Sequence, residues 1–202
     1  MKKFIALILA LVLIATCFGG CSSTEGGEIV IGSIHPLTGS MAYEGQALVN
    51  SQQIAIDRIN AEGGINGKKL RLKVADSLGT SAGSASAAQK LINSGAVALT
   101  GTYTSSSAQI VSRFAEKNQL PFVVTVAATD TLLTNGYKYS FRIQPSTTVF
   151  SKNFIEYVKQ DKTDDMKTVA LIYENSNYGT GIADYIKEHI KETGLEIIGS
   201  IS

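Results

Sequence analysis

The chain has 202 residues, of which 44% are hydrophobic and 17% are charged, an ordinary composition for a globular protein of one or two domains. Its 18 basic and 17 acidic residues give a formal net charge of +1 and show no basic stripe, which argues against a nucleic-acid partner. Both cysteines, Cys17 and Cys21, lie near the N-terminus, so the rest of the chain can form no internal disulfide or cysteine metal site.

The N-terminus predicts a lipoprotein signal peptide over residues 1–20. Two lysines at 2–3 precede an unbroken apolar run at 4–15. A membrane-spanning helix needs roughly twenty apolar residues, so this shorter run fits a signal peptide better. The Phe-Gly-Gly-Cys sequence at 18–21 resembles a bacterial lipobox, although Leu usually opens that motif. We expect Cys21 to carry a lipid that anchors the protein outside the cytoplasm; a plain secretory signal with an incidental cysteine is the alternative.

Residues 21–27 are small, polar and Gly-rich, and we interpret them as a flexible tether. From residue 28 onward, short β-branched runs alternate with segments whose apolar residues recur at helical spacing. Strands are expected at 29–34, 70–74, 96–100, 121–126, 139–143, 169–173 and 195–201. Helices are expected at 46–62, 80–94, 105–118, a short turn after Thr129, 146–159 and 178–193.

This alternation predicts an α/β fold with a doubly wound parallel sheet. We expect a first lobe over residues 28–144 and the beginning of a second lobe over 145–202. The second lobe is expected to be incomplete in this chain, because the sequence ends within the last strand without a helix to cover it. The inner face of the helix at 146–159 is predicted to consist of Val149, Phe150, Phe154, Tyr157 and Val158.

Ligands of open α/β sheets bind beyond the carboxyl ends of the strands. The segments that follow the first, third and fourth strands are small and rich in hydroxyl groups: 36–45, 101–107 and 127–130. The serine run at 105–107 is the strongest signal, because hydroxyls and unpaired backbone N–H groups at the start of a helix can hold a carboxylate. Ordinary helix capping by Ser105 or Ser106 is the alternative explanation, and Thr129 has the same ambiguity.

Patterns for catalysis are incomplete. Residues 179–181 lack the third small residue of a dinucleotide fingerprint, and residues 67–69 lack the Ser or Thr of a P-loop. No Gly-x-Ser-x-Gly elbow is present. His35 lies at a strand end and could meet Ser105, but no carboxylate is placed to orient the pair. We therefore predict a protein that is not an enzyme and that needs no cofactor or metal.

One specific motif and several weaker ones occur in a recognisable order. The run Asn-Ala-Glu-Gly-Gly-Ile-Asn-Gly at 60–67 follows the first predicted helix and is the most specific. The weaker ones are Ile31-Gly32, Pro36-Leu37-Thr38-Gly39, Ser105-Ser106-Ser107, Ala127-Ala128-Thr129, Phe141-Arg142 and Tyr178-Gly179. From residue 28 to 202 the chain thereby resembles the branched-chain amino-acid-binding branch of the periplasmic binding proteins, the type I solute-binding proteins of ABC importers.

The resemblance implies a ligand site between two Rossmann-like lobes. It implies that Ser105 and Thr129 hold the ligand's carboxylate and that the backbone at Ala127 helps to hold its ammonium. Tyr103 stands where the family often has a smaller or aliphatic residue, and the family's acidic partner for the ammonium comes from sequence that this chain does not contain. The predicted ligand-binding set, completed by two cleft-lining tyrosines and the neighbours of Ser105, is Ser105, Ala127, Thr129, Tyr43, Tyr178, Thr104 and Ser106.

The resemblance also implies a function. The protein would bind a branched-chain or other small amino acid, or a related amide or carboxylate, and would deliver it to the ABC permease. The lobes would close about a hinge near Gln144-Pro145 without catalysis. The alternative is a ligand-sensing receptor domain, which a downstream transmembrane helix and kinase would favour over an adjacent permease. An enzyme is the third possibility.

Overall fold

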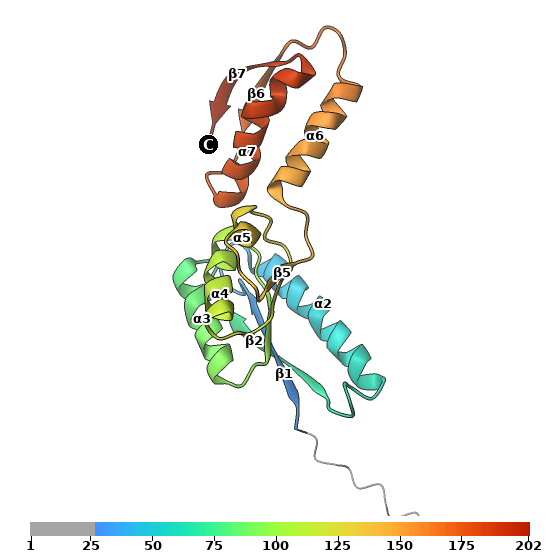
Figure 1. Cartoon of the computed structure of the whole chain (residues 1–202), viewed down its shortest axis with the longest axis vertical. Helices are drawn as coiled ribbons and strands as arrows, with labels where there is room; N and C mark the ends of the chain where they lie inside the picture. The colour runs from blue at the N-terminus through green and yellow to red at the C-terminus, as the bar shows by residue number, and fades with distance from the viewer. Residues whose placement is uncertain (1–26) are drawn as a thin grey trace, which may run out of the picture.

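The computed structural model describes residues 27–202, so the predicted signal peptide and the Cys21 lipidation site lie outside the described part of the chain. The described residues form two α/β bodies that follow one another along the long axis of the molecule (Figure 1). Between residues 27 and 202, no helix combines the length and the apolar character needed to cross a membrane.

The first body is built on a five-stranded, wholly parallel sheet with the strand order β2-β1-β3-β4-β5. Its strands are β1 (Ile29–His35), β2 (Leu70–Asp76), β3 (Ala98–Gly101), β4 (Phe122–Val124) and β5 (Ser140–Arg142). Its helices are α2 (Ala42–Ala61), α3 (Ser81–Asn93), α4 (Ser105–Lys117) and the short α5 (Thr131–Thr134). Because α2 covers one face of the sheet and α3 and α4 cover the other (Figure 1), the predicted doubly wound α/β fold is confirmed.

The main core of the first body lies between the sheet and helices α3 and α4. Leu99 and Phe122 extend from β3 and β4 and are at most 1% exposed. Ala88 and Ala108 on the two helices are fully buried, and such small side chains let the helices lie close to the sheet. Dense packing on this face fixes the positions at which β3 and β4 end.

The second body consists of α6 (Thr147–Asp161), β6 (Thr168–Ile172), α7 (Asn177–His189), the 3₁₀ turn η1 (Ile190–Thr193) and β7 (Glu196–Ile201). β6 and β7 pair in parallel as a two-stranded sheet. A separate core joins this sheet to its helices and consists of Ile155, Ile186, Ile190 and Leu195. The two bodies therefore have independent hydrophobic cores.

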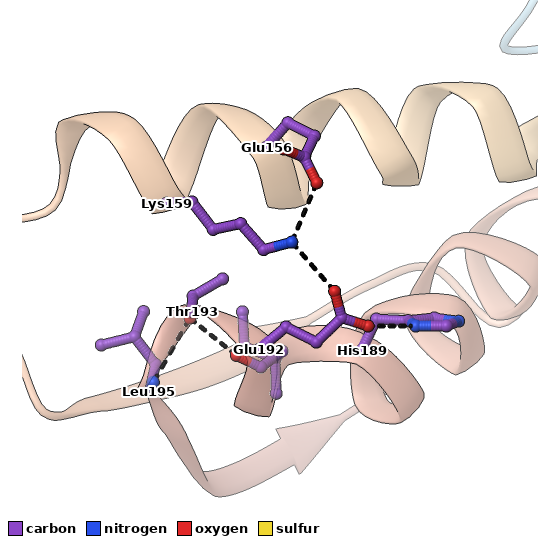
Figure 2. A network of polar contacts seen from close by, with 7 residues as sticks. Glu156, Lys159, His189, Glu192, Thr193 and Leu195 are labelled. Atoms are coloured by element: carbon purple, nitrogen blue, oxygen red, sulfur yellow. Dashed lines mark hydrogen bonds and ion pairs between the residues drawn. The ribbon is translucent and has the colours of Figure 1, made fainter.

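A charged network ties α6 to the end of α7 and to η1 (Figure 2). The Lys159 ammonium lies 2.9 Å from a carboxylate oxygen of Glu156 and 2.9 Å from one of Glu192. Glu192 also contacts His189 Nδ1 at 2.8 Å, and the His189 ring stacks on Tyr185 with 4.1 Å between ring centroids. Solvent screens these exposed charges, so the network adds less to the stability of the second body than its apolar core does.

The predicted inner face of α6 is wrong for three of its five residues. Val149, Phe154 and Tyr157 are 45%, 43% and 60% exposed. The buried side chains of α6 are Thr147, Ser151 and Ile155. Two hydroxyls can be buried here because each has a hydrogen-bond acceptor: Thr147 donates to Asp130, and Ser151 donates to the Thr147 carbonyl at 2.8 Å.

Helix α2 begins at Ala42, four residues before its predicted start. Gly45 permits this early start, because a Cβ atom at this position would overlap the Pro36 carbonyl oxygen. The loop after β1 is therefore short, and Tyr43 lies in the first turn of a helix.

Candidate functional site

A cavity of about 460 Å³ opens beyond the carboxyl ends of β3, β4 and β6, between the two bodies. The first body lines it with the segments that follow β3 and β4, together with Met41 and Gly79. The second body lines it with Glu174, Ser176, Asn177 and Tyr178, which connect β6 to α7. The cavity thus lies beyond the carboxyl ends of the strands, where ligands of open α/β sheets bind.

The start of α4 forms one wall of the cavity. Thr104 caps this helix, and its hydroxyl oxygen accepts a hydrogen bond from the Ser107 backbone N–H at 3.2 Å. Ser105 is 5% exposed. Its hydroxyl oxygen accepts a hydrogen bond from the Thr129 backbone N–H at 3.3 Å. Because that oxygen already accepts, and no acceptor for its proton is present among residues 27–202, the Ser105 hydroxyl can donate to a ligand. The positive end of the helix dipole favours an anionic ligand group at this wall.

The structure brings five of the seven predicted ligand-binding residues into this cavity: Thr104, Ser105, Ser106, Ala127 and Tyr178. Thr129 lies next to it, 6% exposed, and lines an adjoining polar cavity of about 300 Å³. Tyr43 lines neither cavity and is 85% exposed on α2. His35 is fully buried and contacts the Gln52 amide nitrogen at 3.1 Å, so it does not pair with Ser105.

Several lining residues were not among the predicted set. They are Met41, Gly79, Tyr103, Val126, Ala128, Gln144, Glu174, Ser176 and Asn177. Glu174, Ser176 and Asn177 follow the predicted strand at 169–173. Their place beyond the carboxyl end of that strand is the sequence signal that could have predicted them. Tyr103, which also lines the cavity, stands where the family often has a smaller or aliphatic residue.

Hydrogen bonds at the boundary hold the start of α6 against the first body. The Asp130 carboxylate accepts from the Thr147 hydroxyl and from the Thr148 backbone N–H, the latter at 3.0 Å, and the Thr147 N–H donates to the Ala128 carbonyl at 2.8 Å. Partial burial alone would raise the pKa of Asp130, but hydrogen bonds from Ser146, Thr147 and Thr148 outweigh it and lower that pKa. The loop after β4 thus contacts both the cavity and the second body.

One further contact crosses the boundary beside the cavity. The Asn177 amide donates to Gln109 Oε1 on α4 at 3.3 Å, and Gln109 donates in turn to the Thr131 hydroxyl at 2.7 Å. Asn177 lines both cavities. This hydrogen bond therefore joins a residue of the cavity wall on the second body to α4 of the first body.

The family model for periplasmic binding proteins matches residues 28–202 of the chain. The Leu/Ile/Val-binding protein homolog 8 of Brucella abortus (strain 2308) is 29% identical over 180 residues, which are 85% of this chain and 44% of that protein. The Leu/Ile/Val-binding protein homolog 7 of Brucella suis biovar 1 (strain 1330) is 27% identical over 208 residues, covering 100% of this chain and 50% of that protein. The chain spans about half the length of the curated relatives it matches.

Solved structures show the same fold. The branched-chain amino acid transporter substrate-binding protein LivJ of Streptococcus pneumoniae, in complex with isoleucine, is 31% identical with a TM-score of 0.78, over 87% of this chain and 49% of that one. A solute-binding protein of an ABC transporter from Rhodopseudomonas palustris BisB5, in complex with 3,4-dihydroxybenzoic acid, is 22% identical with a TM-score of 0.77, over 86% of this chain and 47% of that one.

Proposed function

Because this chain belongs to the periplasmic binding protein family, we propose that it is the extracytoplasmic solute-binding component of an ABC importer. Its ligand is a branched-chain or other small amino acid, held in the cavity between the two bodies, which act as lobes. The observation that carries this proposal is the start of α4, where Thr104, Ser105 and Ser106 face the cavity with the N-terminal backbone of the helix. Such a wall suits a carboxylate.

The other walls suit the remainder of an amino acid. Met41, Val126, Tyr103 and Tyr178 offer apolar and aromatic surface for a side chain. Ala127 contributes backbone beside the same space. Two relatives named as Leu/Ile/Val-binding homologues and a solved neighbour that holds isoleucine favour an amino acid, while the neighbour that holds 3,4-dihydroxybenzoic acid makes an aromatic acid the competing ligand class.

The mechanism is capture and delivery rather than turnover. Within the described residues the chain crosses from the first lobe to the second between β5 and α6, at residues 143–146, which we assign as part of a hinge. Rotation about this hinge brings the β6–α7 segment toward the start of α4 and removes water from the ligand, so that its charges interact more strongly with the walls. The closed form is then recognised by the permease, and the lipid at Cys21 keeps the protein at the membrane.

A thermal-shift panel on the full-length protein with Cys21→Ser tests the ligand class. The panel contains the twenty amino acids, small amides and aromatic acids. A ligand at a hundred times its dissociation constant stabilises by about 2.7 kcal/mol, which gives a clear shift. We expect an aliphatic amino acid to produce it and Ser105→Ala to reduce it strongly.

The matched control is Ser112→Ala on the same helix. Ser112 is fully buried and its hydroxyl has no hydrogen-bond partner among the described residues, so its removal breaks no contact with the cavity. This variant should keep the full ligand shift. A panel in which no amino acid shifts the melting temperature would reject the proposed ligand class.

The lipid anchor has its own test. Expression of the wild-type gene in a bacterial host with radiolabelled palmitate should label the protein and place it in the membrane fraction. Cys21→Ser should remove both the label and the membrane association, whereas Cys17→Ser should change neither. Labelling that survives in Cys21→Ser would reject lipidation at this residue.

A further inference from the structure

The loop at residues 127–130, which follows β4, is bonded to both lobes. The start of α6, in the second lobe, donates hydrogen bonds to the Ala128 carbonyl and to the Asp130 carboxylate. The first lobe holds the residue between them, because the Ser105 hydroxyl on α4 accepts from the Thr129 backbone N–H. A loop that carries part of the predicted ligand-binding set is thus attached to two bodies that change their relative position when the proposed hinge rotates.

Arg142, the last residue of β5, supplies a second bond from the first lobe to this loop. Its Nη1 donates to the Thr129 carbonyl oxygen at 2.7 Å. Partial burial lowers the pKa of Arg142 and the negative charge of Asp130 offsets part of that effect, so the guanidinium remains protonated. A hydrogen bond from a charged donor is stronger than one between neutral groups. Both main-chain polar groups of Thr129 are therefore bonded to the first lobe.

The place of Arg142 in the fold favours a role in the site over a role in the core. It directly precedes residues 143–146, where the chain crosses to the second lobe. Its Nε is buried and has no hydrogen-bond partner among residues 27–202. Burial of an unpaired donor on a charged group costs stability, so packing alone does not account for an arginine at this position.

We propose that Arg142 is a positioning residue for ligand binding. It anchors the Thr129 carbonyl to the sheet of the first lobe, so that the loop at 127–130 keeps its place beside the ligand while α6 moves with the second lobe. Arg142 lines neither cavity and acts through Thr129. This inference rests on the proposed function, and it gives a role to the Phe-Arg pair at 141–142, which the cavity walls do not use.

Hydrogen exchange in the ligand-free, full-length protein with Cys21→Ser tests the anchor without a ligand. Arg142→Met removes the charged donor and keeps a long unbranched side chain. We expect the Thr129 amide to exchange at least about tenfold faster in this variant, as expected for the loss of one hydrogen bond to a charged group. Arg142→Lys should restore part of the protection, because lysine still offers a charged donor.

The matched control is Arg113→Met, which makes the same substitution on the exposed surface of α4 outside both cavities. It should leave the exchange rate of the Thr129 amide unchanged.

Isothermal titration tests whether the anchored loop serves the ligand. The probe is leucine, or 3,4-dihydroxybenzoate where leucine does not bind. Arg142→Met should weaken binding about tenfold, and Arg142→Lys should weaken it less. In a Thr129→Ala background, Arg142→Met should weaken binding by a further factor of less than about two, because the side chain that Arg142 positions is already absent. Arg113→Met should leave the affinity unchanged.

The outcomes separate the inference from the proposed function. An unchanged exchange rate of the Thr129 amide in Arg142→Met would overturn the anchor, whatever the ligand is. Unchanged affinity in Arg142→Met, or losses from Arg142→Met and Thr129→Ala that simply add, would overturn the positioning role and leave a solute-binding protein in place. Failure of both probes to bind the wild type would overturn the proposed ligand classes and, with them, the role of Arg142 in binding.

Discussion

At the scale of single residues, burial of His35 couples the stability of the first lobe to pH. Burial lowers the pKa of His35 from 6.5 to about 4, and the hydrogen bond with Gln52 offsets only part of that effect. As the pH falls from 6.5 toward 4, the unfolded chain therefore takes up a proton that the folded protein excludes. Stability that is fully present above pH 6.5 is lost in this window, by up to about 3 kcal/mol.

Urea unfolding at a series of pH values measures this coupling. The free energy of unfolding of the wild type should fall more steeply between pH 6.5 and 4 than that of His35→Gln, which cannot titrate. His189→Gln is the control, because this partly exposed histidine lies at the end of α7 and should leave the steep fall intact. Parallel curves for His35→Gln and the wild type would contradict the argument.

Single residues also show where sequence reasoning about the site ends. Ser105 could be predicted because a serine run between a strand and a helix is a local signal, and the structure places it in the cavity wall. The exposure of Tyr43 depends on the early start of α2, which a close contact between Gly45 and Pro36 permits. That contact joins residues nine positions apart, and no local pattern in the sequence predicts it.

At the scale of elements, α6 shows the limit of amphipathic patterns. Its aromatic and β-branched residues suggested one inner face, but the buried positions include Thr147 and Ser151. Hydrogen bonds decide this outcome, because Asp130 of the first lobe accepts from Thr147 and satisfies its hydroxyl. A pattern of hydrophobicity within one helix contains no information about an acceptor on another lobe.

The same contact predicts the effect of changing Asp130. Its carboxylate caps the start of α6 by accepting from the Thr148 N–H at 3.0 Å, so Asp130→Ala should destabilise the protein by about 1–2 kcal/mol. Because the folded-state pKa of Asp130 is lowered, this stabilisation is present above the unfolded value of 3.8 and is lost as the pH falls through the folded value. Denaturant melts at neutral and acidic pH measure both effects.

A matched substitution on α7 is the control for Asp130→Ala. Asp184→Ala removes an exposed carboxylate of α7, whose ion-pair contact within the described part of the chain, to Lys187, spans 3.9 Å. It should change the free energy of unfolding by less than about 0.5 kcal/mol. Equal losses in the two variants would mean that net charge rather than capping is responsible.

At the scale of the whole molecule, the order of elements was predictable and the relation between the lobes was not. Each strand and helix between β1 and β7 was expected from local composition and periodicity, and the parallel sheet follows from their alternation. Contacts across the boundary, such as Asn177 with Gln109, join residues 68 positions apart. Two polar, partly exposed side chains give no signal that they meet.

The Asn177–Gln109 hydrogen bond is expected to limit the range of distances between the two lobes in the ligand-free protein. It is the one side-chain hydrogen bond between α4 and α7 among residues 27–202, at 3.3 Å, and α4 and α7 otherwise touch little. Asn177→Ala should therefore widen the distribution of distances between spin labels placed at Lys117 and Lys187, one on each helix, in the ligand-free protein. Asn153→Ala, on the exposed surface of α6, should leave the distribution unchanged.

The free energy of unfolding is a second readout. A hydrogen bond of this kind contributes only about 1 kcal/mol, so Asn177→Ala should barely change the free energy of unfolding while it changes the distances between the lobes. Unchanged distances in Asn177→Ala would show that the hinge alone sets the arrangement of the lobes.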